Sequence, residues 1–191
     1  VNDKMLSFTY ERRFEGHPAY TELWGIRKSI REMGNRMRKS SYSEREAARS
    51  RINHLRERAT ELEIQINEDL FSGARVIAST LVSSNHRILT GRRFTTLFID
   101  EAAQALEAAC WIAIRKADRV IFAGDHCQLP PTIKFIEAAR NGLEQTLMEK
   151  VAANKQETVS LLKVQYRMHQ SIMQFSSEWF YQGELQAAPE V

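Results

Sequence analysis

The chain has 191 residues with a formal net charge of +3, and 43% of them are hydrophobic and 27% charged. This length can bury one core and carry one appended element. No run of about 18 apolar residues occurs, so the composition excludes a membrane-spanning protein and we expect no membrane partner. The two cysteines, Cys110 and Cys127, form no disulfide framework. We therefore expect a reducing compartment, the cytosol or, in a eukaryote, the nucleus.

Two long amphipathic helices are predicted over residues 18–72. The first has an apolar stripe at spacings of three and four, formed by Leu23, Ile26, Ile30, Met33 and Met37. The second has a similar stripe, formed by Ala48, Ile52, Leu55, Ala59, Leu62, Ile66 and Leu70. The polar run Ser40–Ser43 lies between them, so the helices should fold back as an antiparallel hairpin. Pro18 and Gly73 are typical end signals for such a hairpin.

The predicted hairpin is strongly basic. Between Arg27 and Arg58 there are eleven basic and four acidic residues, a net charge of +7. Such a surface can neutralise phosphates and release their counterions, which favours binding to nucleic acid. A solvated helix face would have the same composition, and the charge pattern alone leaves both interpretations open.

After Gly73 the pattern changes to short apolar runs that alternate with helical segments, which predicts an α/β fold with a parallel sheet covered on both faces. Helices are predicted over Ala102–Ile114 and Leu143–Val151. The predicted strands are Arg75–Thr80, Thr95–Asp100, Arg119–Ala123 and Val159–Val164. Open α/β sheets bind their ligands at the carboxyl ends of the strands, so we expect the chemistry there.

Two adjacent carboxylates end the second predicted strand. The sequence LFIDEAAQ places Asp100 and Glu101 directly after an apolar run, the form of a Walker B strand. In that role Asp100 holds Mg²⁺ through water, and Glu101 accepts a proton from the water that attacks a γ-phosphate. A pair of acids at the start of a helix is the alternative interpretation.

Two further motifs follow the next predicted strands. In GDHCQLPP, Gln128 offers both a donor and an acceptor to a phosphate or its attacking water, whereas His126 and Cys127 lack further ligands at zinc spacing. In QYRMH, Arg167 can neutralise charge on a transferred phosphoryl group, or it can form a structural surface pair. The aromatic run Phe175–Tyr181 is interpreted as a packed helix face rather than a base-stacking platform.

The three motifs DEAAQA, GDHCQLPP and VQYRMH, in this order, resemble motifs II, III and IV of superfamily-one helicases of the 5′-to-3′ group related to the nonsense-mediated-decay helicase. The resemblance covers most of the chain. It implies a RecA-like P-loop NTPase sheet with a long antiparallel helical hairpin inserted beside the nucleic-acid channel, and ATP and Mg²⁺ as cofactors.

The resemblance also implies roles for single residues. Asp100 and Glu101 handle Mg²⁺ and the attacking water, Gln128 senses the γ-phosphate, and Arg167 is the arginine finger. Tyr166 is assigned more weakly, to a contact with the nucleotide base. Weaker assignments to nucleic-acid binding cover five further residues: Ser79, Thr80, Arg36, Arg38 and Lys39.

No G-x-x-x-x-G-K-[ST] phosphate loop occurs in the sequence, and motifs V and VI are also missing. The resemblance therefore implies a segment of a larger motor that requires the rest of its own polypeptide to hydrolyse ATP. Its expected parts are a linker over 1–17, the hairpin over 18–72, the later part of the first RecA-like domain over 73–164, and the junction to the second over 165–191.

The function expected from these observations is ATP-dependent unwinding of, or translocation on, single-stranded DNA or RNA. A nucleic-acid-binding scaffold with a non-hydrolysing ATP site is the alternative. A transporter or recombinase ATPase would account for the acidic pair but not for the other two motifs. The choice between DNA and RNA and the oligomeric state stay open.

Overall fold

The computed structural model describes residues 3–37 and 42–191. The chain forms two units, Val1–Ala78 and Ser79–Val191. The first unit is entirely helical where it is regular, with α1 (Asp3–Leu6), α2 (Tyr10–Glu15), α3 (Tyr20–Met37) and α4 (Tyr42–Ser72). Within the described ranges, no helix combines the length and the hydropathy that a membrane span requires.

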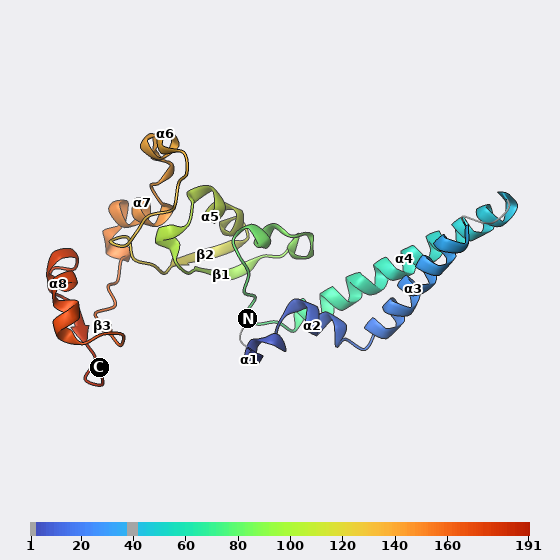
Figure 1. Ribbon diagram of the computed structural model, residues 1–191, viewed down its shortest axis with the longest axis horizontal. Helices are drawn as coiled ribbons and strands as arrows, with labels where there is room; N and C mark the ends of the chain where they lie inside the picture. Colours follow the sequence, from blue (N-terminus) through green and yellow to red (C-terminus); the bar gives the residue numbers. More distant parts are fainter. Residues whose placement is uncertain (1–2, 38–41) are drawn as a thin grey trace. The chain divides into compact units, whose positions relative to one another are not determined.

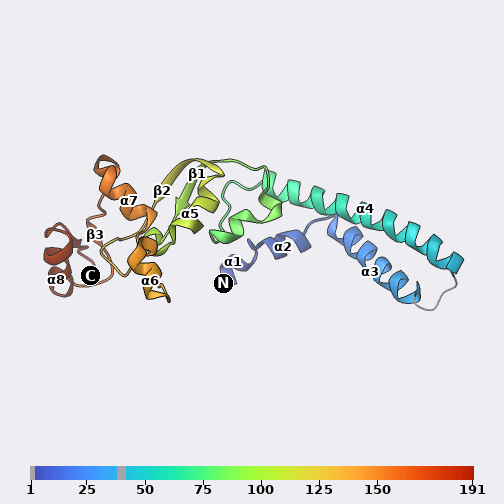
Figure 2. The same cartoon turned by 90° about the horizontal axis from the view of Figure 1, so that it is seen from above.

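The predicted helical hairpin is present. Helices α3 and α4 run side by side in opposite directions (Figures 1 and 2). Both apolar stripes face inward, and Leu23, Leu62 and Ile66 are almost completely buried between the helices. Spacings of three and four keep successive apolar side chains on one face of a helix, which is why the sequence predicted this pair correctly.

Helix α2 closes the base of the hairpin. Phe14 is buried in the same cluster as Leu23, Leu62 and Ile66. Its ring contacts that of Tyr20 edge to face, with 5.9 Å between the ring centroids. Such contacts tie the start of the chain to the hairpin, because a buried aromatic ring removes a large apolar area from water.

The hairpin core gives a direct test of burial. Ile66 is 0% exposed and Ile64, on the same helix, is 53% exposed. We expect Ile66→Ala to lower the free energy of unfolding of this unit by about 2–5 kcal/mol, because it removes buried methyl groups and leaves a cavity. Ile64→Ala should cost much less, below about 1 kcal/mol. Hydrogen exchange of the α4 amides measures both, and equal losses would contradict the assigned inward face.

The second unit is built around a parallel pair of strands. Strand β1 (Phe94–Ile99) pairs with β2 (Ala117–Phe122), in a register that places Phe94 opposite Ala117 and Ile99 opposite Phe122. The 3₁₀ turn η3 (Ala102–Gln104) and helix α5 (Glu107–Ile114) connect the two strands. This β-α-β arrangement confirms the predicted α/β class with parallel pairing.

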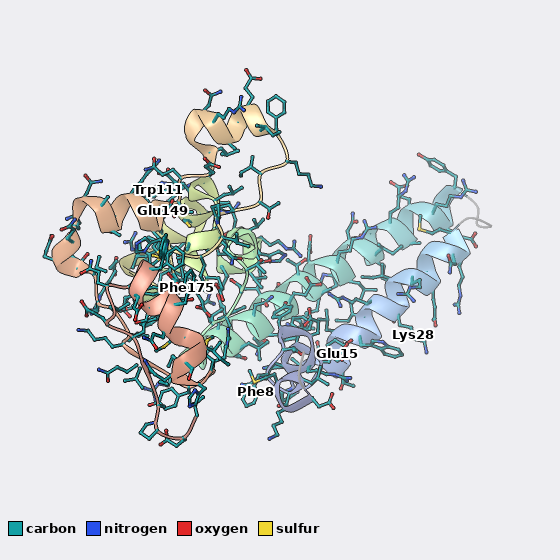
Figure 3. The ribbon with its side chains drawn as sticks, turned by 60° about the vertical axis from the view of Figure 1, so that its left-hand side comes forward. Phe8, Glu15, Lys28, Trp111, Glu149 and Phe175 are labelled. Atoms are coloured by element: carbon teal, nitrogen blue, oxygen red, sulfur yellow. The ribbon has the colours of Figure 1, made fainter. Side chains whose placement is uncertain are left out.

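Helix α7 (Leu147–Asn154) packs on this sheet layer. Leu147 is buried with Ile99, Ala102 and Cys110. Lys150 of α7 donates to Glu107 of α5 at 2.6 Å, and this hydrogen bond is the main cause that lowers the pKa of Glu107. Figure 3 labels Trp111 on α5, whose ring nitrogen donates to the same carboxylate. These contacts hold the two helices together beside the sheet.

The remaining elements of the second unit are short. A second parallel pair joins β3 (Val164–Gln165) to β4 (Gln186–Ala187), and helix α8 (Gln170–Phe180) lies between them in sequence. The other elements are η1 (Val82–Asn85), η2 (Arg87–Leu89), α6 (Ile136–Ala138), the π-helical turn η4 (Ala139–Leu143) and η5 (Gln156–Thr158).

Two of the four strand predictions were wrong. Residues 75–80 are irregular, with Val76 86% exposed, and of Val159–Val164 only the last residue joins a strand, with Leu162 87% exposed. Both segments have the apolar composition of strands. A strand also requires a neighbouring strand that pairs with its backbone N–H and C=O groups. Among the described residues, Val164 is the one residue of these two segments that is paired in a sheet.

Both helix predictions in this unit were partly wrong. The predicted helix over Ala102–Ile114 is divided into η3 and α5, because the backbone is extended at Ala105 (φ -92°, ψ 127°) and Leu106 (φ -60°, ψ 136°) between them. The helix predicted from Leu143 begins at Leu147. Thr146 and Glu149, the latter labelled on α7 in Figure 3, form a capping box that fixes this start.

Candidate functional site

The carboxyl ends of β1 and β2 are joined by two backbone hydrogen bonds. The Ala123 amide donates to Ile99 at 2.8 Å, and the Ala102 amide donates to Ala123 at 2.9 Å. Between them, Glu101 adopts a left-handed backbone conformation with φ 51° and ψ 38°. This conformation costs a non-glycine residue about 1–3 kcal/mol and is held only where surrounding contacts require it. The chain thus turns sharply at the acidic pair.

Gly124 brings the GDHCQLPP loop against this turn. A Cβ atom at Gly124 would lie 3.0 Å from the amide nitrogens of both Ala102 and Ala103, and 3.1 Å from Sδ of Met148. Only glycine allows such a close backbone approach. The two loops predicted to carry the chemistry, DEAAQ and GDHCQ, are therefore in contact, as expected for the ends of neighbouring parallel strands.

The tight contact at Gly124 predicts opposite effects for two glycine substitutions. Gly124→Ala should lower stability by about 1–3 kcal/mol, since two backbone amides cannot yield to the new methyl group. Gly34→Ala, in α3, should raise it by about 0.5–1 kcal/mol, because a Cβ there meets nothing within 4 Å and alanine favours the helix. Hydrogen exchange of β1 and of α3 reports the two changes separately. A neutral Gly124→Ala would contradict the close approach.

Asp100 and Glu101 are both exposed at this edge. One oxygen of Asp100, Oδ1, accepts the Glu101 amide at 3.0 Å. In the part of the chain that the structure describes, the other oxygen makes no hydrogen bond and remains available to a ligand. Exposed carboxylate oxygens fit Mg²⁺, which takes one or two carboxylates and keeps several waters.

Gln128 is held by Asp125 in a tight turn. The Gln128 side-chain nitrogen donates to Oδ2 of Asp125 at 2.8 Å, and the Cys127 amide donates to Oδ1 at 3.0 Å. The Tyr181 hydroxyl also donates to Oδ2. Burial by itself would raise the pKa of Asp125, but these three donors outweigh it and hold the pKa below its ordinary value. The carboxylate is therefore ionised at neutral pH.

Three side chains of this turn also have the composition of a metal site. Ligand atoms of Asp125, His126 and Cys127 lie within 4.8 Å of one another. Burial, and then the charge of Asp125, raise the pKa of the Cys127 thiol. The Asp125 carboxylate is already bonded to three donors, which favours a hydrogen-bonded turn instead.

The QYRMH loop is organised by Gln165. Its side-chain oxygen accepts the amides of Arg167 at 2.8 Å and Met168 at 2.9 Å, and its nitrogen donates to the Met168 carbonyl. His169 then accepts the Ser171 amide at 3.2 Å and caps α8. Tyr166 and Arg167 are exposed on this loop. In the described ranges, no hydrogen bond or ion pair links the Arg167 side chain to Asp100, Glu101 or Gln128.

The predicted nucleic-acid residues are only partly described. Ser79 and Thr80 are exposed, and the Thr80 hydroxyl accepts the Ser83 amide at 3.3 Å. Arg36 is exposed near the end of α3 and lines a shallow depression with Arg51 and other hairpin residues. Arg38 and Lys39 lie outside the described residues.

Part of the hairpin's basic charge is paired between its helices. Arg27 contacts Glu63 at 2.7 Å, and Arg58 contacts Glu22 at 3.0 Å and Glu61 at 3.3 Å. These exposed pairs contribute little to stability. They do neutralise two of the basic side chains, so the net +7 of the stretch overstates the charge that this surface offers to phosphates.

Several residues of the site carry no signal that single-sequence reasoning detected. Asp125, Gln165 and Tyr181 position the predicted residues through hydrogen bonds. Asp125 and Gln165 lie inside recognised motifs, so the motifs could have indicated them. Tyr181 could not be found in this way, because its partner is 56 residues distant in the sequence.

Comparison with known proteins identifies the family of this chain. The sequence matches two families, each described as an AAA domain, over residues 5–135 and 143–191. DNA-binding protein SMUBP-2 of Mesocricetus auratus is 38% identical over 172 residues, 87% of this chain and 17% of the relative. DNA replication ATP-dependent helicase/nuclease DNA2 of Xenopus laevis is 40% identical over 123 residues, 64% of this chain and 12% of the relative.

A third relative connects the chain to the group named from its motifs. Regulator of nonsense transcripts 1 homolog of Drosophila melanogaster is 40% identical over 118 residues, 61% of this chain and 10% of the relative. The chain spans 17% or less of the length of these three relatives. The first AAA domain match alone covers more than half of the chain, and the resemblance drawn from the three motifs is confirmed. The chain belongs to the AAA domain family of superfamily-one ATP-dependent helicases.

Proposed function

We propose that this chain is part of the motor of an ATP-dependent helicase that translocates on single-stranded DNA or RNA. The observation that carries the proposal is the contact between the DEAAQ and GDHCQ loops at Gly124. This contact supports the proposal because it brings the loop that carries Asp100 and Glu101 against the loop that carries Gln128, at the carboxyl ends of two parallel strands, where α/β sheets bind their ligands.

In the proposed site each side chain has a separate task. Asp100 holds a Mg²⁺ ion through water, and the ion, when bound, neutralises charge on the phosphate oxygens of ATP. Glu101 accepts the proton of the attacking water. Gln128 contacts the γ-phosphate or that water. Arg167 supplies positive charge to the transferred phosphoryl group, and Tyr166 lies against the nucleotide base.

We further propose that the chain is a segment of a RecA-like domain whose sheet other parts of the protein complete. The support is the exposure of apolar residues in extended segments. Val76 and Leu162 lie on such segments, and Phe98 of β1 is 69% exposed. Apolar extended segments of this kind are buried when further strands and helices cover them. The proposed boundaries are those given above at residues 17, 72 and 164.

The basic hairpin is the proposed contact with the nucleic-acid backbone, together with Ser79 and Thr80. Arg49, Arg51 and Arg56 are exposed on α4, and no ion pair of the described residues includes them. Lys28, labelled on α3 in Figure 3, lies over the exposed Trp24 ring, 5.4 Å from its centroid. Contacts between basic side chains and the phosphates of a nucleic-acid backbone give salt-dependent binding with little sequence preference.

The proposal is tested by the ATPase rate of the intact protein with single-stranded DNA, with single-stranded RNA, and with neither. A motor should hydrolyse ATP faster when a strand is bound, and the stronger activator identifies the preferred polymer. An unstimulated rate together with salt-sensitive strand binding would instead support a binding scaffold whose ATP site does not hydrolyse.

A further inference from the structure

The end of α8 touches the loop that carries Gln128 at two adjacent places. The Tyr181 hydroxyl donates to Oδ2 of Asp125, and the Cys127 thiol lies 3.8 Å from the carbonyl oxygen of Phe180. Tyr181 directly follows the last helical residue of α8. Neither Tyr181 nor Phe180 has a role of its own toward ATP in the proposed site, so what their contacts with this loop do is a separate question.

The carboxylate of Asp125 fixes the orientation of the Gln128 amide. An ionised carboxylate only accepts hydrogen bonds, so the Gln128 nitrogen must face it, and this bond is 2.8 Å long. The amide oxygen is then the atom that Gln128 presents elsewhere. An oxygen can accept a hydrogen bond from a water molecule but not from an ionised phosphate. The orientation therefore favours contact with the attacking water.

Tyr181 shares one oxygen with Gln128. Both side chains donate to Oδ2 of Asp125. If Gln128 moves from that oxygen to the nucleotide, the hydrogen bond from Tyr181 to Asp125 becomes stronger. If Tyr181 moves away instead, the hydrogen bond from Gln128 to Asp125 becomes stronger. Burial, and then the bond to Asp125, raise the pKa of the Tyr181 hydroxyl, which therefore remains a donor throughout the neutral range.

Helix α8 connects this contact with the loop of Arg167. The helix has 11 residues, about 16 Å at the rise of an α-helix. At its start His169 caps it directly after the loop that Gln165 holds. Along its length Met173 and Ser177 are buried, and the Ser177 hydroxyl accepts the Leu185 amide at 3.1 Å. A short helix fixed at these points moves as one body.

We propose that Asp125 is a positioning residue for Gln128 and that its bond to Tyr181 forms a latch, which couples the state of Gln128 to the helix that follows Arg167. This inference rests on the proposed function, in which Gln128 and Arg167 face the same nucleotide. Through the latch, binding of a γ-phosphate next to Gln128 would change the position of α8. A movement of α8 would in turn change the position of Gln128.

The test is Tyr181→Phe in the intact protein, which removes one hydroxyl and retains the ring. Tyr10→Phe is the matched control, because the Tyr10 hydroxyl also donates a hydrogen bond, to Asn67 at 2.9 Å in the other unit. The first readout is hydrogen exchange without nucleotide. The Cys127 amide donates a hydrogen bond to Asp125. Tyr181→Phe should increase the exchange rate of this amide by about tenfold, because a hydrogen bond to a charged group contributes about that factor to an equilibrium constant.

The second readout is coupling, the ratio of affinities for a labelled single-stranded DNA with and without a non-hydrolysable ATP analogue. Tyr181→Phe should reduce this ratio by about tenfold and leave the KM for ATP unchanged. Asp125→Asn should also lower kcat, because asparagine has one acceptor oxygen in place of two and cannot accept from both the Gln128 side chain and the Cys127 amide. Tyr10→Phe should match the wild type in the exchange of the Cys127 amide, the coupling ratio, the KM for ATP and kcat.

Each result separates the latch from the proposed function. Unchanged exchange at Cys127 in Tyr181→Phe would overturn the latch even in an active helicase. Faster exchange with unchanged coupling would overturn the link to α8. A wild-type protein whose ATPase no strand stimulates would overturn the proposed function and the coupling together, while the exchange measurement would still decide whether Tyr181 holds the Asp125 loop.

Discussion

Arg167→Ala is expected to reduce strand-stimulated kcat for ATP by about 10³–10⁵-fold, the factor that an arginine finger supplies in other nucleotidases. The structure presents Arg167 on an exposed loop that the Gln165 side chain holds by its backbone amides. Removal of the guanidinium should therefore leave the loop folded. Because the charge acts on the transition state, kcat and kcat/KM should fall together.

Two further variants make this result specific. Arg167→Lys retains the charge but not the planar fork of donors, so its rate should lie between those of Arg167→Ala and the wild type. Arg140→Ala removes another exposed arginine, in η4, and should have no effect on the rate. If Arg167→Ala retained the wild-type rate, Arg167 would be a structural surface residue and the finger would have to come from elsewhere.

Glu101→Gln is expected to reduce the same rate by about 10²–10⁴-fold, the usual contribution of a general base. Glutamine is nearly isosteric with glutamate and meets the same backbone strain at φ 51°, so the turn between β1 and η3 should be unchanged. Binding of a fluorescent ATP analogue, measured by titration, should be retained. The variant would then hold nucleotide without hydrolysing it.

The control for this variant is Glu137→Gln, the same change at an exposed position on α6. It should have the wild-type rate and melting temperature. Wild-type hydrolysis by Glu101→Gln would remove Glu101 from the proposed mechanism. Loss of nucleotide binding would show instead that the charge of Glu101 is required to bind ATP, and not only to accept the proton of the attacking water.

The hairpin and the two strands β1 and β2 were predictable because their patterns are local. Apolar spacings of three and four place Leu23 and Ile66 on inward faces. A continuous apolar run identifies β1 without knowledge of its neighbour. The motif residues Asp100, Glu101, Gln128 and Arg167 were predicted in the same way, from short runs that place specific functional groups next to the end of a strand, and their roles remain predictions.

The failed predictions depended on distant partners. Residues 75–80 have the composition of a strand but lack a paired neighbour in the described chain. The helix predicted from Ala102 is interrupted where the backbone becomes extended at Ala105 and Leu106, directly after the turn on which Gly124 packs. In both cases the tertiary surroundings of the segment outweighed its local propensity.

The sequence by itself therefore determined the class of the fold, the family and the residues expected to carry the chemistry. Only the tertiary structure decided how these residues are held. The contact of Tyr181 with Asp125 spans 56 residues, and the approach of Gly124 to Ala102 depends on the pairing of β1 with β2. Hydrogen bonds and close contacts act over a few ångströms in space, whereas a sequence pattern records only neighbours along the chain.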